Sequence, residues 1–173
     1  GVGTSHRLDD GCRAACDAAV KILDDGGDAL DAVAEAVRTL EDDGRFNAGA
    51  GSILRLDGMT RELDAGLMDS GSRLGAVIAL RDVRNPILVA RAIVETPHVI
   101  LCGEGATRFA AERGFERLGP VPEAVRDRHL RTVSLMENGR LGDEYPRWKG
   151  HDINSLWNFP ARPHTEALPS DTV

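Results

Sequence analysis

One threonine near the end of the printed sequence has a setting in which its hydroxyl could become a nucleophile. Asp171, Thr172 and Val173 close a long segment that is rich in proline and glycine. A threonine hydroxyl is a weak nucleophile unless a base lies beside it. Peptide cleavage before Thr172 would free an α-amine that titrates at about 7.7–8.0 and could serve as that base. Taken alone, an ordinary threonine in a tail is the simpler interpretation.

A second candidate site lies in the stretch 45–69, the most distinctive part of the chain. It begins with the small residues 47–51, NAGAG, which are too rich in glycine for a helix interior. Such a segment lets two backbones approach closely or lets carbonyl groups converge on an ion. The three carboxylates of residues 41–43 precede it, at a helix end where the dipole disfavours negative charge. A nearby cation or solvent exposure would explain them, and exposure is the simpler explanation.

The rest of this stretch predicts a β-hairpin. The apolar run 53–56 meets Asp57-Gly58, a dipeptide typical of tight hairpin turns. The return run, residues 61–68, holds Asp64 between apolar neighbours, where we expect it to be buried. The alternative is a glycine-rich hairpin in an ordinary α/β domain.

Two amphipathic helices are predicted before this hairpin. The first runs from about residue 9 to residue 23, with Asp9 or Asp10 as its cap, and the second begins at Asp28. Gly44 is expected to end the second helix in a left-handed conformation. Apolar residues repeat at helical spacing in both. They are Cys12, Ala15, Cys16, Ala19 and Leu23 in the first helix, and Leu30, Val33, Val37 and Leu40 in the second.

Strands and helices alternate after the hairpin. Asn85-Pro86 is the expected start of one helix, because proline is favoured at the first helical position. Residues 138–171 contain four prolines and no sustained periodicity, which predicts a flexible tail or linker. The other predicted elements are a strand at 74–81 that is buried on both faces, a helix from 86 to about 95, a strand at 99–102, a helix at 104–113 and a polar helix at 122–136.

Several catalytic motifs are absent from the sequence. Gly49-Ala50-Gly51 is not followed by Gly-Lys and is therefore no phosphate-binding P-loop. Gly103-Glu104-Gly105 lacks the third glycine of a dinucleotide-binding fingerprint. Neither a G-x-S-x-G elbow nor an H-E-x-x-H zinc motif occurs. The five histidines are scattered without ligand spacing, so we expect surface or capping roles for them.

Composition and charge narrow the possible partners. The 173 residues suffice for one domain with a core, and the net charge of −7 argues against nucleic acid and anionic membranes as partners. Three cysteines without metal or disulfide spacing favour a reducing, cytoplasmic setting, with Cys12 and Cys16 as buried thiols. The sequence begins at Gly1 without a methionine, as expected of a processed or cut chain.

Four segments, taken together, resemble one known family. They are LEDDGRFNAGAGS, RELDAGLMDS, the run LGAVIALRDVRNPILVARAIVETPHVILCGEGATRFAAERGF and the terminal DTV. In this order and spacing they resemble the plant-type asparaginase/isoaspartyl peptidase branch of the N-terminal-nucleophile (Ntn) hydrolases. The resemblance covers residues 1 to about 118 and returns at Thr172-Val173. The sister glycosylasparaginases and threonine aspartases share the fold but differ at the FNAG segment.

The resemblance implies a fold and a domain organisation. The fold is expected to be α+β, part of a four-layer αββα sandwich with helices packed on a mainly antiparallel sheet. Residues 1–137 would form the α-subunit core without its first strand, 138–171 a flexible linker and 172–173 the start of the β subunit. The expected partners are a small-molecule substrate and the chain's own β subunit, in an (αβ)2 dimer without nucleic acid or membrane.

The resemblance also implies roles for single residues. Thr172 would attack the carbonyl of Asp171 in an N–O acyl shift that splits the chain, and would then attack the side-chain amide of asparagine or a β-aspartyl peptide. Asn47 would hold the threonine hydroxyl. No organic cofactor is expected, but a structural Na+ would bind main-chain carbonyls. Those carbonyls belong to Leu40, Glu41, Asp43, Phe46, Ala48 and Ala50.

Two positions depart from the family pattern. Asp171 precedes the nucleophile where this branch usually has glycine, and Ser70 replaces the glycine after Met68-Asp69. Because the sister branches carry aspartate at that point, glycosylasparaginase or threonine aspartase is the first alternative. A non-catalytic α/β binding domain is the alternative of another class. Residues that bind the substrate are expected in the β part, beyond Val173.

Overall fold

The computed structural model describes residues 8–151, and residues 1–7 and 152–173 lie outside the described part. The described part divides into two compact units. The first comprises residues 8–52 and 61–122, and the second comprises residues 53–60 and 123–151. None of the helices within residues 8–151 combines the length and the apolar character that crossing a membrane would take.

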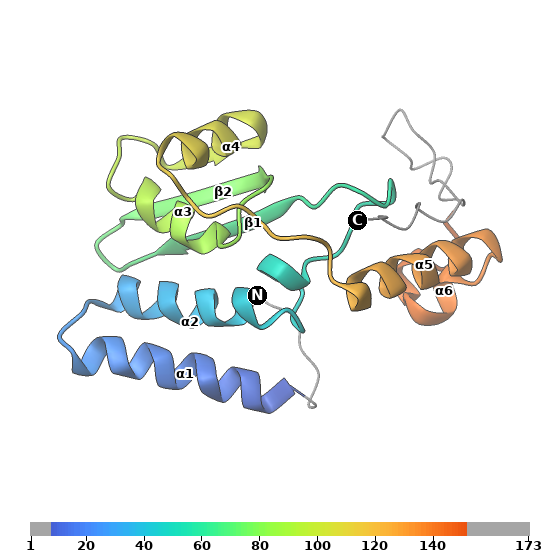
Figure 1. Ribbon diagram of the computed structural model, residues 1–173, viewed down its shortest axis with the longest axis horizontal. Helices are drawn as coiled ribbons and strands as arrows, with labels where there is room; N and C mark the ends of the chain where they lie inside the picture. Colours follow the sequence, from blue (N-terminus) through green and yellow to red (C-terminus); the bar gives the residue numbers. More distant parts are fainter. Residues whose placement is uncertain (1–7, 152–173) are drawn as a thin grey trace. The chain divides into compact units, whose positions relative to one another are not determined.

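The first unit contains a mixed sheet of three strands (Figure 1). Strand β1 (Leu63–Met68) pairs antiparallel with β2 (Leu74–Leu80), and β2 pairs in parallel with β3 (Ile100–Cys102). A bulge interrupts the β1–β2 ladder where Ala79 adopts a φ of 51°. There the N–H of Ala79 donates to Asp64 Oδ1 at 2.8 Å. This bulge helps to fix the register and hence the two faces of the sheet.

Only one face of this sheet is covered by the described residues. Leu67 of β1 lies opposite Gly75 of β2, and Leu67 and Val77 are buried on the covered face. The prediction of a strand at 74–81 is confirmed, but the prediction that both its faces are buried is wrong. The open face carries large apolar side chains that are between 37% and 68% exposed, namely Met68, Leu74, Ile78 and Ile100.

Four helices accompany the sheet in the described part of the first unit. Helices α3 (Pro86–Ile93) and α4 (Gly103–Glu112) pack on the strands, α2 (Ala29–Asp43) packs on α3 and β1, and α1 (Asp9–Asp24) packs on α2 (Figure 1). These elements share one core. It consists of Leu30, Ala34, Leu63, Leu67, Val77, Leu80, Val83, Ile87, Val89, Ala90, Ile93, Ala106 and Ala110.

The second unit contains helix α5 (Glu123–Glu137), the short helix α6 (Leu141–Glu144) and a 3-10 turn at Pro146–Trp148. The last two elements lie within the segment 138–171, for which the sequence predicts a linker. The part of that segment from residue 152 onward is outside the described residues. The apolar side chains buried in this unit include Leu54, Val125, Val133 and Leu141.

Several local predictions are confirmed. Asp28 caps α2 by accepting a hydrogen bond from the N–H of Asp31 at 2.8 Å, and Gly44 ends the helix with a φ of 75°. Asn85 and Pro86 begin α3. The α+β fold class, with helices packed on a sheet, is confirmed as well. The sheet itself is mixed, with one antiparallel pair and one parallel pair.

The predicted hairpin between residues 53–56 and 61–68 is wrong. A tight turn does form, because the N–H of Arg55 donates to the carbonyl of Thr60 at 2.8 Å and Asp57 Oδ1 accepts from the N–H of Thr60 at 2.8 Å. The pairing stops there, however, and residues 53–56 form no strand. Strand β1 instead pairs with β2 across the turn at residues 69–73. The Asp-Gly signal identified the turn but not the strand pair.

Three burial predictions are also wrong. Asp64 is exposed because it lies on the open face of β1. Cys16 is exposed and Cys12 is only partly buried, because the buried positions of α1 are Gly11 and Ala15. The first helix also differs at its start, where Leu8 occupies the cap position without a side-chain hydrogen bond, and Asp9 and Asp10 lie in the first turn.

Candidate functional site

Asn47 lies on the loop that follows α2, and the structure anchors this loop immediately before it. Asn47 itself is exposed, whereas Phe46 is 1% exposed. The ring of Phe46 packs against Gly11 of α1, where an added Cβ would lie 2.6 Å from the ring. Burial of one large side chain thus holds the exposed amide at a defined place on the surface of the first unit.

The glycines after Asn47 allow the loop to fold back on the end of α2. Gly49 has a φ of 47°, and a Cβ there would lie 2.6 Å from the carbonyl oxygen of Glu41. A Cβ on Gly51 would lie 2.2 Å from the carbonyl oxygen of Phe46 and 2.3 Å from that of Gly44. Any larger residue would clash, so these two positions require glycine. Main-chain oxygens do gather at this turn, as the glycine-rich segment predicts.

The predicted Na+ ligands fit this arrangement in part. The carbonyl oxygens of Glu41 and Phe46 belong to the crowded turn. Two others already accept hydrogen bonds, Ala48 from the N–H of Gly51 at 3.0 Å and Ala50 from Arg61 Nη1 at 3.3 Å. A carbonyl oxygen has two lone pairs, so these bonds do not exclude a cation, although the guanidinium charge makes Ala50 the weaker candidate. Within the described residues no cluster of side chains forms a metal site.

Of the three carboxylates of residues 41–43, Glu41 is buried and Asp42 and Asp43 are partly buried and ion-paired, so solvent exposure does not explain the acidic run. Glu41 is 2% exposed, and its Oε1 accepts a hydrogen bond from the N–H of Ile87 at 3.1 Å. Its Oε2 is buried without a hydrogen-bond partner. Burial raises the pKa of the Glu41 carboxyl from 4.5 to about 7, although the hydrogen bonds from Ile87 and Asn85 act in the opposite direction.

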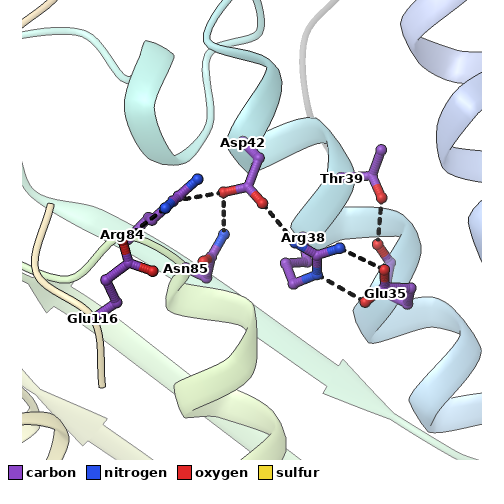
Figure 2. Close-up of polar contacts among 7 residues, drawn as sticks. All are labelled: Glu35, Arg38, Thr39, Asp42, Arg84, Asn85 and Glu116. Atoms are coloured by element: carbon purple, nitrogen blue, oxygen red, sulfur yellow. Dashed lines mark hydrogen bonds and ion pairs between the residues drawn. The ribbon is translucent and has the colours of Figure 1, made fainter. Parts of the chain in front are cut away.

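Asp42 joins α2 to the start of α3 (Figure 2). Its Oδ1 accepts from Arg84 Nε at 2.9 Å and from Asn85 Nδ2 at 3.1 Å, while its Oδ2 accepts from Arg38 Nη1 at 2.6 Å. Arg84 also pairs with Glu116 at 2.7 Å. Each guanidinium therefore bridges two carboxylates, because Arg38 binds Glu35 as well.

Asp43 faces the opposite way, toward α1. Its Oδ1 accepts from Arg45 Nε at 2.6 Å, and Arg45 also pairs with Asp10 at 2.8 Å. The hydrogen bond from Arg45 lowers the pKa of both carboxylates. Together with Phe46, this pair fastens the loop to α1.

Sequence reasoning singled out Asn47 and the glycine-rich loop, and four of the six predicted carbonyl-bearing residues, Glu41, Phe46, Ala48 and Ala50, lie in this loop or contact it. It missed the Glu41 and Asp42 side-chain contacts with α3, because their partners lie more than 40 residues away. The acidic run itself was the available signal. Asp171 and Thr172, the predicted cleavage pair, lie outside the described residues.

Comparison with known proteins supports the resemblance. A sequence model of the asparaginase family matches residues 3–141. A plant-type L-asparaginase from Thermococcus kodakarensis is 54% identical over 100 residues, which cover 56% of this chain and 32% of that protein. An isoaspartyl peptidase from Escherichia coli is 49% identical over 102 residues, covering 58% of this chain and 32% of the relative. An isoaspartyl peptidase/L-asparaginase from Rattus norvegicus is 39% identical over 146 residues, covering 82% and 43%.

The structure defines an α+β protein with helices packed on a mixed sheet and a glycine-rich loop at the end of α2, where main-chain oxygens gather. The family match extends over most of the chain, and the chain belongs to the asparaginase family. It spans less than half the length of these curated relatives.

Proposed function

We propose that the protein containing this chain is an autoprocessing amidohydrolase that cleaves L-asparagine and β-aspartyl (isoaspartyl) peptides, with this chain as its α-subunit portion. Family membership and the names of the relatives support the activity. The structural observation that carries it is the loop between Phe46 and Gly51, which holds Asn47 at the surface between two buried attachments.

In the processing step, Thr172 Oγ1 attacks the carbonyl carbon of Asp171. The peptide C–N bond breaks, an ester links the two residues, and the threonine α-amine becomes free. Water then hydrolyses the ester and leaves Asp171 with a carboxylate and Thr172 as a new N-terminus. The Asn47 side-chain amide would orient the attacking hydroxyl through a hydrogen bond, since it can act as both donor and acceptor.

In the hydrolytic step, the same hydroxyl attacks the side-chain amide of the substrate. The free α-amine of Thr172 takes the hydroxyl proton and passes it to the leaving ammonia or peptide amine. Water then hydrolyses the resulting ester, which releases the free carboxylate and restores the threonine. This scheme needs a nucleophile and a base from one residue, as in threonine hydrolases of the Ntn type.

The open sheet face supports the proposed partner. Met68, Ile78 and Ile100 are large, exposed apolar side chains on the same open face of the sheet. Such a surface is unfavourable in water, so we propose that the chain's own β subunit covers it. A sheet stacked on this face would complete the αββα sandwich. The (αβ)2 assembly is part of the same proposal.

A structural Na+ forms a further part of the proposal. It would bind the main-chain oxygens gathered at the end of α2, including those of Glu41 and Phe46. Its chemistry there would be electrostatic, because a hard cation offsets the partial negative charge at a helix C-terminus. No step of the reaction is assigned to it.

One sequence feature favours a second candidate function. Asp171 precedes Thr172, as in the sister glycosylasparaginases and threonine aspartases. Assays with L-asparagine, a β-aspartyl dipeptide and a glycosylated asparagine would distinguish the two branches by which substrate releases product fastest.

The processing step can be tested by intact-mass spectrometry of the gene product that contains these residues. We expect two fragments that divide between Asp171 and Thr172, and release of ammonia from asparagine after the cleavage. Thr172→Ala should give an intact, inactive protein, and Asn47→Ala should cleave more slowly. As a matched control, Asn138→Ala lies on the second unit and should cleave normally. An uncleaved wild type that is also inactive would favour the non-catalytic binding domain instead.

A further inference from the structure

The side chain of Glu41 connects the end of α2 to the start of α3. Its Oε1 accepts from the N–H of Ile87, which lies in the first turn of α3 and has no partner within the helix. Asn85 precedes the helix without making a capping hydrogen bond, and its amide nitrogen donates to Asp42. The first turn of α3 is thus capped by a residue that lies 46 positions earlier in the chain.

The same residue also supports the loop that carries Asn47. Gly49 packs against Glu41, and a Cβ on Gly49 would lie 2.6 Å from both the Cβ and the carbonyl oxygen of Glu41. Glu41 therefore contacts α3 through its carboxylate and the loop through its Cβ and backbone.

The energetics of this carboxylate argue against a role in stability alone. A buried carboxylate with one unsatisfied oxygen is unfavourable, and Glu41 Oε2 has no hydrogen-bond partner. An apolar side chain of similar volume would remove that cost, but it would leave the N–H of Ile87 unsatisfied and release the link to α3. The arrangement favours a defined position of the loop over maximal stability.

We infer that Glu41 is a positioning residue, whose side chain fixes the glycine-rich loop against the start of α3 and thereby sets the place of Asn47. The inference deepens the proposed function, since Asn47 is the residue assigned to orient the threonine hydroxyl. It assigns Glu41 no contact with the substrate.

Amide hydrogen exchange, followed by NMR on the full-length protein that contains these residues, tests this inference. In Glu41→Leu, the N–H groups of Ile87, Gly51 and Ser52 should exchange about tenfold faster than in the wild type, relative to the N–H of Ala76 in β2. Glu41→Gln should restore exchange to within about threefold, because its amide oxygen can accept the same hydrogen bond from Ile87.

Two further variants keep the test decisive. Leu30→Ala, on the buried face of the same helix, should speed exchange at all these positions alike, because it lowers the overall stability. Glu41→Asp is one methylene shorter and should also lose the hydrogen bond from Ile87. It should therefore show the same local increase in exchange, and it provides the test if the leucine variant does not fold. If Glu41→Asp gives the uniform pattern of Leu30→Ala, or no change, the inference is wrong. Exchange needs no catalysis, so this result is independent of whether the chain's protein proves to be a hydrolase.

Discussion

Burial of Glu41 predicts a specific pH dependence of stability. The pKa of its carboxyl is about 7 in the folded chain and 4.5 as its ordinary value. Between these two pH values the folded state holds a proton that the unfolded state has lost. Raising the pH through this window therefore favours unfolding. A shift of this size corresponds to about 3 kcal/mol of unfolding free energy, which is present below pH 4.5 and lost above pH 7.

Glu41→Gln removes this titration and keeps the shape of the side chain. Urea unfolding of both proteins between about pH 4.5 and pH 8, in choline chloride to avoid hard cations, gives the difference in unfolding free energy. That difference should move by about 3 kcal/mol in favour of the variant as the pH rises. The groups that face the carboxyl, Asp42, Arg38, Asn85 and the N–H of Ile87, are the same in both proteins.

Glu35→Gln is the matched control on the same helix. Arg38 lowers the pKa of Glu35, so the stability that Glu35 contributes is present above its ordinary pKa and is lost only as the pH falls below it. The difference in unfolding free energy between Glu35→Gln and the wild type should therefore stay constant between pH 5 and 8. If the Glu41→Gln difference is equally flat, the carboxyl is not raised in the folded chain and the reasoning is refuted.

Three other predictions concern packing and one partly buried histidine. In Gly75→Ala the new Cβ would lie 2.1 Å from the carbonyl oxygen of Ala90, so the unfolding free energy measured in urea should fall by about 1–3 kcal/mol. In the control variant Gly66→Ala the new Cβ would make ordinary contacts, so the unfolding free energy should hardly change. Phe46→Ala should cost about 3–5 kcal/mol in thermal unfolding, because a fully buried ring is removed. Burial lowers the pKa of His129, so its contribution to stability is present above pH 6.5 and is lost as the pH falls below that value. His129→Gln should remove this acid sensitivity. Urea unfolding at about pH 5 and pH 8 would measure it.

Each of these predictions has a clear contrary result. Equal losses for Gly75→Ala and Gly66→Ala would show that α3 does not approach β2 closely. A Phe46→Ala variant as stable as the wild type would show that the ring does not anchor the loop. If His129→Gln still loses stability below pH 6.5, that loss comes from another group and the prediction for His129 is wrong.

Features that depend on neighbouring residues could be predicted from the sequence. The cap at Asp28, the left-handed Gly44 and the helix start at Asn85-Pro86 all follow from local backbone chemistry, and all are present. The hairpin prediction failed because a turn signal does not identify the strands that pair. Apolar residues of β1 found their partners in β2, across a turn at residues 69–73 that has no Asn-Gly or Asp-Gly pair.

Features that depend on distant contacts could not be predicted. The burial of Glu41 follows from its contact with Ile87, and the pairing of Asp42 follows from Arg84 and Asn85. Nothing in the acidic run itself distinguishes a buried carboxylate from a solvated one. The family resemblance provided the site, and the family match confirms that resemblance; the roles of Thr172, Asp171, Asn47 and the sodium-binding carbonyls stay predictions.

The arginine pairs around α2 have a practical consequence for chemical labelling. The cations that join Asp42 and Asp43 to neighbouring elements are guanidiniums, which amine-reactive reagents do not modify. The printed sequence has only two lysines, Lys21 and Lys149, and both side chains are exposed. Dyes or cross-linkers directed at amines should therefore attach at these two positions and at the chain's α-amine, and leave the ion pairs of the fold intact.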